Sequence, residues 1–363
     1  MEKSAIGQLL QEPLPGQRPH RLQTLQALRF FAASAVLFHH AIASASIAQG
    51  LEFPRFISGW NFGGLGIYVF FVLSGYVITL QVGISPLRFG LHRLARIYPA
   101  FLCSLVLATA LLYFVGALPA STIRFDWSFL LLPAGQVQTW NFVPYWTLMY
   151  EMAFYAAIFC FILCGTKTFD FLLTAWIGVI VVMGYRHPIE PGWATDWKIL
   201  LTNPLCLMFV AGAVLARAHR GTIWPGAAFL ALVFLPNYWG HFIGTESAVI
   251  GIGIAGVMQL CILAENHIRV PNILIRGGDA SYGLYLIHHP INLALCAVIP
   301  NAPNLLWPII GIMIIVAGGG GLLFGWADHV FYRWIKNAID IRLRAKPSFD
   351  TTNVIAPDRV VAS

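Results

Sequence analysis

Apolar stretches of about 20 residues recur along this chain from residue 25 to residue 327, and the segments between them are short. In a helix such a stretch matches the thickness of the hydrocarbon core of a bilayer. Backbone polar groups must be satisfied internally in lipid, so stretches of this kind form helices there. The pattern predicts an all-α protein, a polytopic transmembrane helical bundle.

We expect about ten spans in a single membrane domain, residues 25–335. The N-terminal tail is residues 1–24, and residues 336–363 form a basic C-terminal tail. The stretch 123–133 is too short to span and is expected to be an interfacial or re-entrant segment. The ten predicted spans lie near residues 25–47, 62–82, 98–118, 145–165, 169–185, 199–217, 221–239, 246–264, 280–299 and 305–327.

Composition and charge agree with a multi-pass membrane protein. Hydrophobic residues make up 58% and charged residues only 10% of the chain, which excludes an ordinary soluble domain. The net charge of +7 does not indicate nucleic-acid binding, because its distribution follows topology. In the ten-span arrangement, 18 of the 22 lysines and arginines fall on one side of the membrane. The positive-inside rule then predicts that both termini are cytoplasmic.

The six cysteines all lie in apolar stretches, without the spacing of zinc ligands or of a disulfide framework. We expect them to be small buried hydrophobic residues, and we expect neither a metal site nor a permanently bound cofactor.

Within the first apolar stretch, Arg29 and His40 are eleven residues apart. At about 100° per residue they share one helix face, roughly 16 Å apart along the axis. Ionisable groups at such depth are costly unless they function or are paired. The imidazole has an ordinary pKa of about 6.5, which suits it to take and return a proton near neutrality. His39 points about 100° away from His40.

Two further motifs follow, one inside the second predicted span and one after it. Ser74 and Gly75 interrupt the second apolar run, which indicates close helix packing or a local irregularity. Arg93 and Arg96, three residues apart, share a helix face in what we expect to be a cytoplasmic loop. Their guanidinium groups suit the phosphates of a cytosolic donor, although arginines in such loops also serve as topology signals.

Glu151 is the one acidic residue deep in a predicted span. An unpaired carboxylate there is costly, so we expect it to face a cavity, to be protonated or to bond a histidine.

The ninth span carries a second histidine pair, His288 and His289. At its start, Asp279 and Ser281 are expected to act as helix caps. Asp328 and His329 are expected to mark the interfacial end of the last span, near the cytosol.

Together these motifs resemble the acyltransferase-3 family of membrane O-acyltransferases, which modify bacterial exopolysaccharide, lipopolysaccharide and Nod-factor sugars. The opening LQALRFFAA is similar to the exopolysaccharide-acetylating subgroup, and the resemblance spans about residues 22–335. It is carried by five motifs in order: Arg29 with His40, the segment FFVLSGYVI (70–78), Arg93 with Arg96, WTLMYEMAFY (146–155) and SYGLYLIHHP (281–290).

The resemblance implies location in the bacterial inner membrane, an acyl-CoA donor, acetyl-CoA, that enters from the cytosol, and an acceptor that is a carbohydrate or glycolipid. The phosphates would rest on Arg93 and Arg96, and Ser74 and Gly75 are assigned to the same donor site. His40 would act as the base, with Glu151 orienting its imidazole and Arg29 beside the donor. His288 and Tyr285 are candidates for the acceptor site.

Three alternatives stay open from the sequence. Acyl transfer can be direct or can pass through a covalent acyl-histidine intermediate. The buried ionisable residues also suit a proton-coupled transporter of a polar glycolipid or saccharide. The third alternative is a structural subunit of a polysaccharide assembly complex. The sequence does not fix the oligomeric state.

Overall fold

The computed structural model describes residues 22–54, 61–123, 130–132, 143–187, 197–238, 240, 242 and 244–344. Most of the stretch 123–133 and the two ends of the chain lie outside these residues. No β-strand occurs among the described residues, which confirms the all-α prediction. Ten helices of more than ten residues are present in this part of the chain: α2 (Gln23–Ala48), α4 (Phe62–Thr79), α5 (Pro86–Phe114), α6 (Tyr145–Leu163), α7 (Phe169–Arg186), α9 (Cys206–His219), α10 (Trp224–Phe234), α11 (Thr245–Ala264), α12 (Asn272–Val298) and α13 (Leu306–Arg344).

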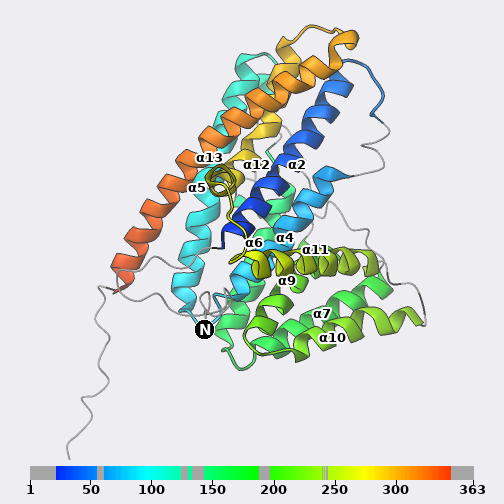
Figure 1. Cartoon of the computed structure of the whole chain (residues 1–363), viewed down its shortest axis with the longest axis vertical. Coiled ribbons are helices and arrows are strands. Elements are labelled where there is room, and N and C mark those ends of the chain that lie inside the picture. Colours follow the sequence, from blue (N-terminus) through cyan, green and yellow to red (C-terminus); the bar gives the residue numbers. More distant parts are fainter. Residues whose placement is uncertain are drawn as a thin grey trace, which may run out of the picture.

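Each predicted span overlaps one of these ten helices, and the polytopic helical bundle is confirmed. Seven of them are long and apolar enough to cross a membrane. The helices α9 and α10 are shorter, with 14 and 11 residues, and α12 is not among the seven. In Figure 1, α7, α10 and α11 run across the direction of α2 and α13, so the ten helices do not share one tilt. Seven candidate spans are thus found among the described residues by length and apolarity, while the number of ten spans and the cytoplasmic placement of the termini stay predictions.

Three helices extend well beyond the predicted spans on what the topology predicts to be the cytoplasmic side. The expected arginine loop is the first part of α5, which begins at Pro86 with the hydroxyl of Ser85 as its N-cap. The last helix, α13, continues to Arg344. Because α12 begins at Asn272, Asp279 and Ser281 lie inside the helix, and the predicted cap role is wrong.

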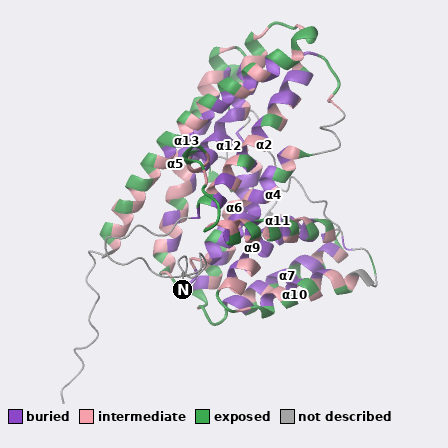
Figure 2. Ribbon diagram, in the orientation of Figure 1, coloured by how far each residue is buried: buried purple, intermediate pink, exposed green. Residues whose placement is uncertain are grey.

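The centre of the bundle is formed by α12 and α2, with α13 packed along α12 and α4 packed between α2 and α9. Buried residues follow α2, α4 and α12 along most of their length (Figure 2). A Cβ on Gly75 would overlap the carbonyl oxygen of Phe209, and one on Gly212 would overlap the carbonyl oxygen of Val72. Only glycine lets α4 and α9 approach this closely, so Gly75 serves helix packing.

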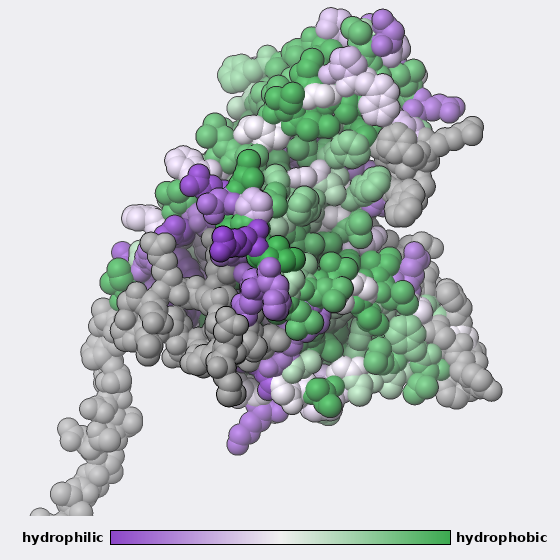
Figure 3. All heavy atoms as spheres, in the orientation of Figure 1, coloured by the Kyte–Doolittle hydropathy of each residue, from purple (hydrophilic) through white to green (hydrophobic). Residues whose placement is uncertain are grey.

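The outer surface is suited to lipid. Most of the face shown in Figure 3 is hydrophobic, with hydrophilic side chains gathered in a patch left of its centre. Large apolar side chains such as Phe114, Ile47 and Ile315 are 83%, 75% and 74% exposed. A soluble protein would not leave so many of these exposed. Cys103, Cys160 and Cys164 also lie on this surface, so the expectation that all cysteines are buried is wrong for these three.

Candidate active site

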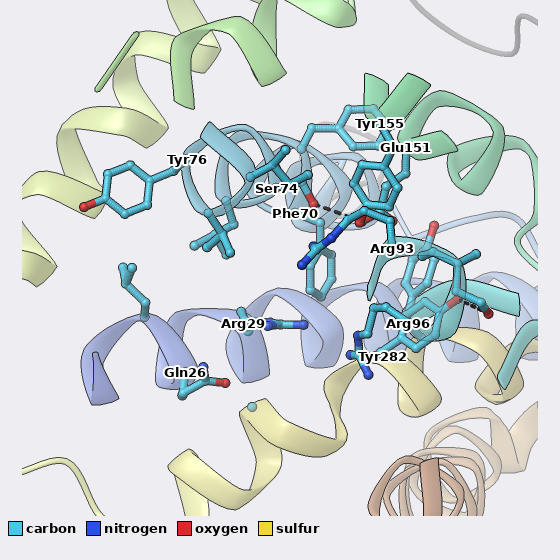
Figure 4. A pocket seen from close by; sticks show the side chains of 18 of the residues that line it. Gln26, Arg29, Phe70, Ser74, Tyr76, Arg93, Arg96, Glu151, Tyr155 and Tyr282 are labelled. Atoms are coloured by element: carbon cyan, nitrogen blue, oxygen red, sulfur yellow. Dashed lines mark hydrogen bonds between the residues drawn. The ribbon is translucent and has the colours of Figure 1, made fainter. Parts of the chain in front are cut away.

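A cavity of about 410 Å³ lies where α2, α4, α5, α6, α12 and α13 meet. This volume falls in the range of small-molecule sites. Its lining combines apolar and aromatic side chains with polar and charged groups (Figure 4). The charged and amide-bearing residues of the lining are Gln26, Arg29, Gln81, Arg93, Arg96, Glu151, Asp279, His329 and Lys336.

Arg29 lines this cavity from α2. In Figure 4, Arg29 and Arg93 point into the same space from α2 and α5. Two cations from different helices therefore face one cavity, an arrangement suited to an anionic ligand.

The two arginines of α5 are not equivalent. Arg96 donates from Nη1 to Oδ2 of Asp328 at 3.0 Å, and the two side chains are only 15% and 5% exposed. Its guanidinium also lies over the rings of Tyr282 and Tyr332, at 4.6 and 5.2 Å from their centroids. Asp328 is thus the buried partner of Arg96 in the interior of α13, which continues past it to Arg344.

Arg93, unlike Arg96, forms no ion pair among the described residues. Its Nη2 donates to the side-chain oxygen of Gln81 at 3.1 Å, and its guanidinium lies 5.5 Å from the ring centre of Tyr155. Its Nε is buried and has no hydrogen-bond partner among the described residues. Arg93 is therefore the better candidate of the pair for binding an anion.

Glu151 faces the cavity, but its partners differ from the predicted histidine. Its Oε1 accepts a hydrogen bond from the hydroxyl of Ser74 at 3.1 Å and a second one from the hydroxyl of Tyr155. Ser74 thus lines the cavity as predicted, while its neighbour Gly75 packs against α9 instead. The expectation that Glu151 orients His40 is not met, because His40 bonds to another residue.

That residue is His288. Nδ1 of His40 and Nε2 of His288 are 2.8 Å apart, and the two rings are stacked with 5.1 Å between centroids. The ring of His289 is 4.5 Å from that of His40, while His39 turns aside and lies 5.7 Å from the ring of Phe53. The two histidine pairs, predicted separately, meet across α2 and α12.

His40 does not line the cavity, so the expected open track from Arg29 to His40 is interrupted. Tyr285 connects the two parts, because it lines the cavity and its ring lies 6.2 Å from that of His288. The hydroxyl of Tyr285 is hydrogen-bonded to that of Thr147 at 2.6 Å, and its ring contacts Phe70 at 5.7 Å. The cavity therefore ends one aromatic ring away from the histidines.

Sequence reasoning missed several lining residues. Tyr155 could have been predicted, since it stands one helical turn after Glu151. Gln81 and Lys336 could not be found in this way, because each reaches the cavity through the packing of helices far apart in the sequence. No three His, Cys, Asp or Glu side chains in the described part of the chain are placed to hold a metal ion.

Comparison with known proteins identifies the family of this chain. The model of the acyltransferase domain of the acyltransferase-3 family matches residues 22–324. The chain is 25% identical to the acyltransferase MdmB of Streptomyces mycarofaciens, over 74% of this chain and 78% of MdmB. It is 26% identical to nodulation protein 10 of Rhizobium leguminosarum bv. viciae, over 75% and 83% of the two chains.

A third relative is the exopolysaccharide production protein ExoZ of Rhizobium meliloti (strain 1021), 27% identical over 63% of this chain and 76% of ExoZ. No solved structure gives a significant match. The family match covers most of the chain, including the helices that carry Arg29, His40, Arg93 and Glu151. The chain is therefore a multi-pass membrane protein that belongs to the acyltransferase-3 family of acyltransferases.

Proposed function

We propose that this acyltransferase moves an acetyl group from cytosolic acetyl-CoA to a hydroxyl of a carbohydrate or glycolipid on the outer side of the bacterial inner membrane. The family supports acyl transfer. The carbohydrate acceptor is taken from the name of one relative, an exopolysaccharide production protein. The assignment of acetyl-CoA as the donor is argued from the cavity.

The observation that carries the proposal is a cavity with cations at one end and the histidine pair beyond the other. Leu22, Gln81 and Lys336 line the cavity and belong to segments for which the charge distribution predicts the cytoplasmic side. A donor from the cytosol would enter there, with its phosphates on Arg93 and Lys336. Its thioester end would then extend toward Thr147 and Tyr285.

In the reaction, the acceptor hydroxyl oxygen attacks the thioester carbonyl while His40 takes the hydroxyl proton. The carbon–sulfur bond breaks, and the proton passes from His40 to the departing thiolate. The products are the ester and free CoA. The ring of Tyr285 must turn aside for the thioester to reach His40, since it stands at the inner end of the cavity. Holding donor and acceptor together from two sides supplies much of the rate.

Calorimetry with purified protein in detergent and CoA as the ligand tests the donor assignment. Wild-type protein should bind CoA, and Arg93→Gln should bind it at least tenfold more weakly, about 1.4 kcal/mol or more. Arg88→Gln is the matched control, because Arg88 lies on the same helix but pairs with Asp340 and does not line the cavity.

Failure of the wild-type protein to bind CoA would contradict the proposal. It would favour the transporter alternative, which gives CoA no role. If Arg93→Gln and Arg88→Gln lost CoA affinity equally, the overall positive charge of the protein, rather than the cavity, would be what attracts CoA.

A further inference from the structure

His40 and His288 form a hydrogen-bond chain that ends on a backbone carbonyl. Nδ1 of His288 is 2.9 Å from the carbonyl oxygen of Leu284, and Nε2 of His288 is 2.8 Å from Nδ1 of His40. We infer that His288 is a positioning residue that fixes the tautomer of His40, leaving Nε2 of His40 as the proton acceptor. The inference rests on the proposed function, in which His40 is the base.

The direction of each bond follows from the carbonyl. A carbonyl oxygen only accepts, so Nδ1 of His288 must carry a hydrogen. His288 is completely buried, and the hydrogen bonds and ring contacts that it makes in the described part of the chain are with histidine and tyrosine rings and the carbonyl. With no carboxylate among these contacts, the neutral imidazole is the form that this site favours.

A neutral imidazole carries one hydrogen, so Nε2 of His288 can only accept. Nδ1 of His40 must then be the donor, and the lone pair of His40 is left on Nε2. In serine hydrolases a carboxylate holds the catalytic histidine in its working tautomer in the same manner. Here a backbone carbonyl does so through a second imidazole.

Helix packing holds the chain of bonds in place. Leu284 and His288 are one turn apart on α12, so their bond is set by the helix itself. A Cβ on Gly321 of α13 would overlap Leu284, which shows how closely α13 supports this turn. His40 itself is only partly buried, so the base keeps an open side while the group that orients it is sealed.

Two substitutions at His288 separate orientation from packing. Glutamine places a carbonyl oxygen near the position of Nε2 and can still accept from His40, whereas leucine cannot. We expect His288→Leu to lower kcat by between about tenfold and the roughly 10⁴-fold seen when a catalytic histidine adopts the wrong tautomer. The donor KM and the CoA affinity should stay unchanged. His288→Gln should keep kcat within about tenfold of the wild-type value.

Asn292→Leu is the matched control, since Asn292 is also completely buried on α12, one turn further along. It reports the effect of burying a leucine in this helix, and its kcat should exceed that of His288→Leu. The inference is overturned if His288→Leu keeps the wild-type kcat, or if His288→Gln is as slow as His288→Leu while both bind CoA.

A measurement without turnover keeps the inference testable if His288→Leu does not fold. In protein labelled with ¹⁵N-histidine, the neutral imidazoles with hydrogen on Nδ1 that NMR detects should include two assigned by substitution, one lost in His40→Gln and the other in His288→Gln. Assignment of an Nε2–H form to His40 would overturn the inference. Lack of CoA binding by wild-type protein would instead overturn the proposed function and leave the tautomer result standing.

Discussion

The ion pair between Arg96 and Asp328 yields a prediction that separates structure from ligand binding. By sequence, Arg96 belongs with Arg93 as a phosphate ligand. In the structure it bonds Asp328 at 3.0 Å and its guanidinium lies over two tyrosine rings. We therefore expect Arg96→Gln to destabilise the protein rather than to weaken CoA binding selectively.

The magnitude follows from burial. Because the side chains are 15% and 5% exposed, removing the arginine leaves a carboxylate without its partner inside the bundle. Breaking a buried pair in this way costs about 3 to 5 kcal/mol. Loss of two cation–π contacts adds roughly 0.5 to 2 kcal/mol each. Asp328→Asn should cost less, since its amide oxygen can still accept from Arg96 and both ring contacts remain.

Thermal unfolding of the purified protein in detergent, followed by fluorescence, measures these differences. For Arg96→Gln the melting temperature should fall by roughly 5 °C or more. The double variant Arg96→Gln/Asp328→Asn should lose less stability than the two single variants lose together, because no unpaired charge remains. Arg88→Gln, which breaks the more exposed pair with Asp340, should cost less than about 1 kcal/mol. A wild-type melting temperature for Arg96→Gln together with tenfold weaker CoA binding would refute the structural role.

Two further variants test how the helices that carry the site are held. Gly75→Ala should separate α4 from α9 and lower the free energy of unfolding by at least about 1 to 3 kcal/mol. Gly253→Ala is the control and should change it little, because the added methyl group meets open space. Weaker CoA binding by Gly75→Ala at an unchanged melting temperature would instead support the predicted donor role of Gly75. In Glu265→Ala, the carboxylate that accepts hydrogen bonds from the backbone N–H groups of Gln23 and Thr24, at 2.7 and 3.0 Å, is removed. Hydrogen exchange at the start of α2 should become faster, and the free energy of unfolding should fall by about 1 to 3 kcal/mol. Unchanged exchange there would show that α2 begins independently of α11.

The sequence predicted well what depends on one helix at a time. The ten apolar stretches became ten helices, but of the two residues that the eleven-residue spacing put on one face, Arg29 lines the cavity and His40 does not. Helix limits were less reliable where apolarity was the guide. The start of α5 was missed by twelve residues, although Ser85 and Pro86 form a recognisable helix start.

Contacts between helices could not be predicted from the sequence. His40 and His288 are 248 residues apart, and Arg96 and Asp328 are 232 residues apart. Helical periodicity shows which side chains share a face but not which helix covers that face. Glu151 illustrates the limit, because its need for a partner was predicted and the partner was not. A local tyrosine and Ser74 of α4 satisfy it instead of His40.

The role of His40 is tested most directly by the rate of acetyl transfer in membranes that contain the natural acceptor. Labelled acetyl-CoA is supplied on the cytosolic face of vesicles carrying either wild-type protein or His40→Gln at matched amounts. We predict that His40→Gln transfers label about 10² to 10⁴ times more slowly, the contribution of a general base. Transfer by His40→Gln at the wild-type rate would contradict the assignment of His40 as the base.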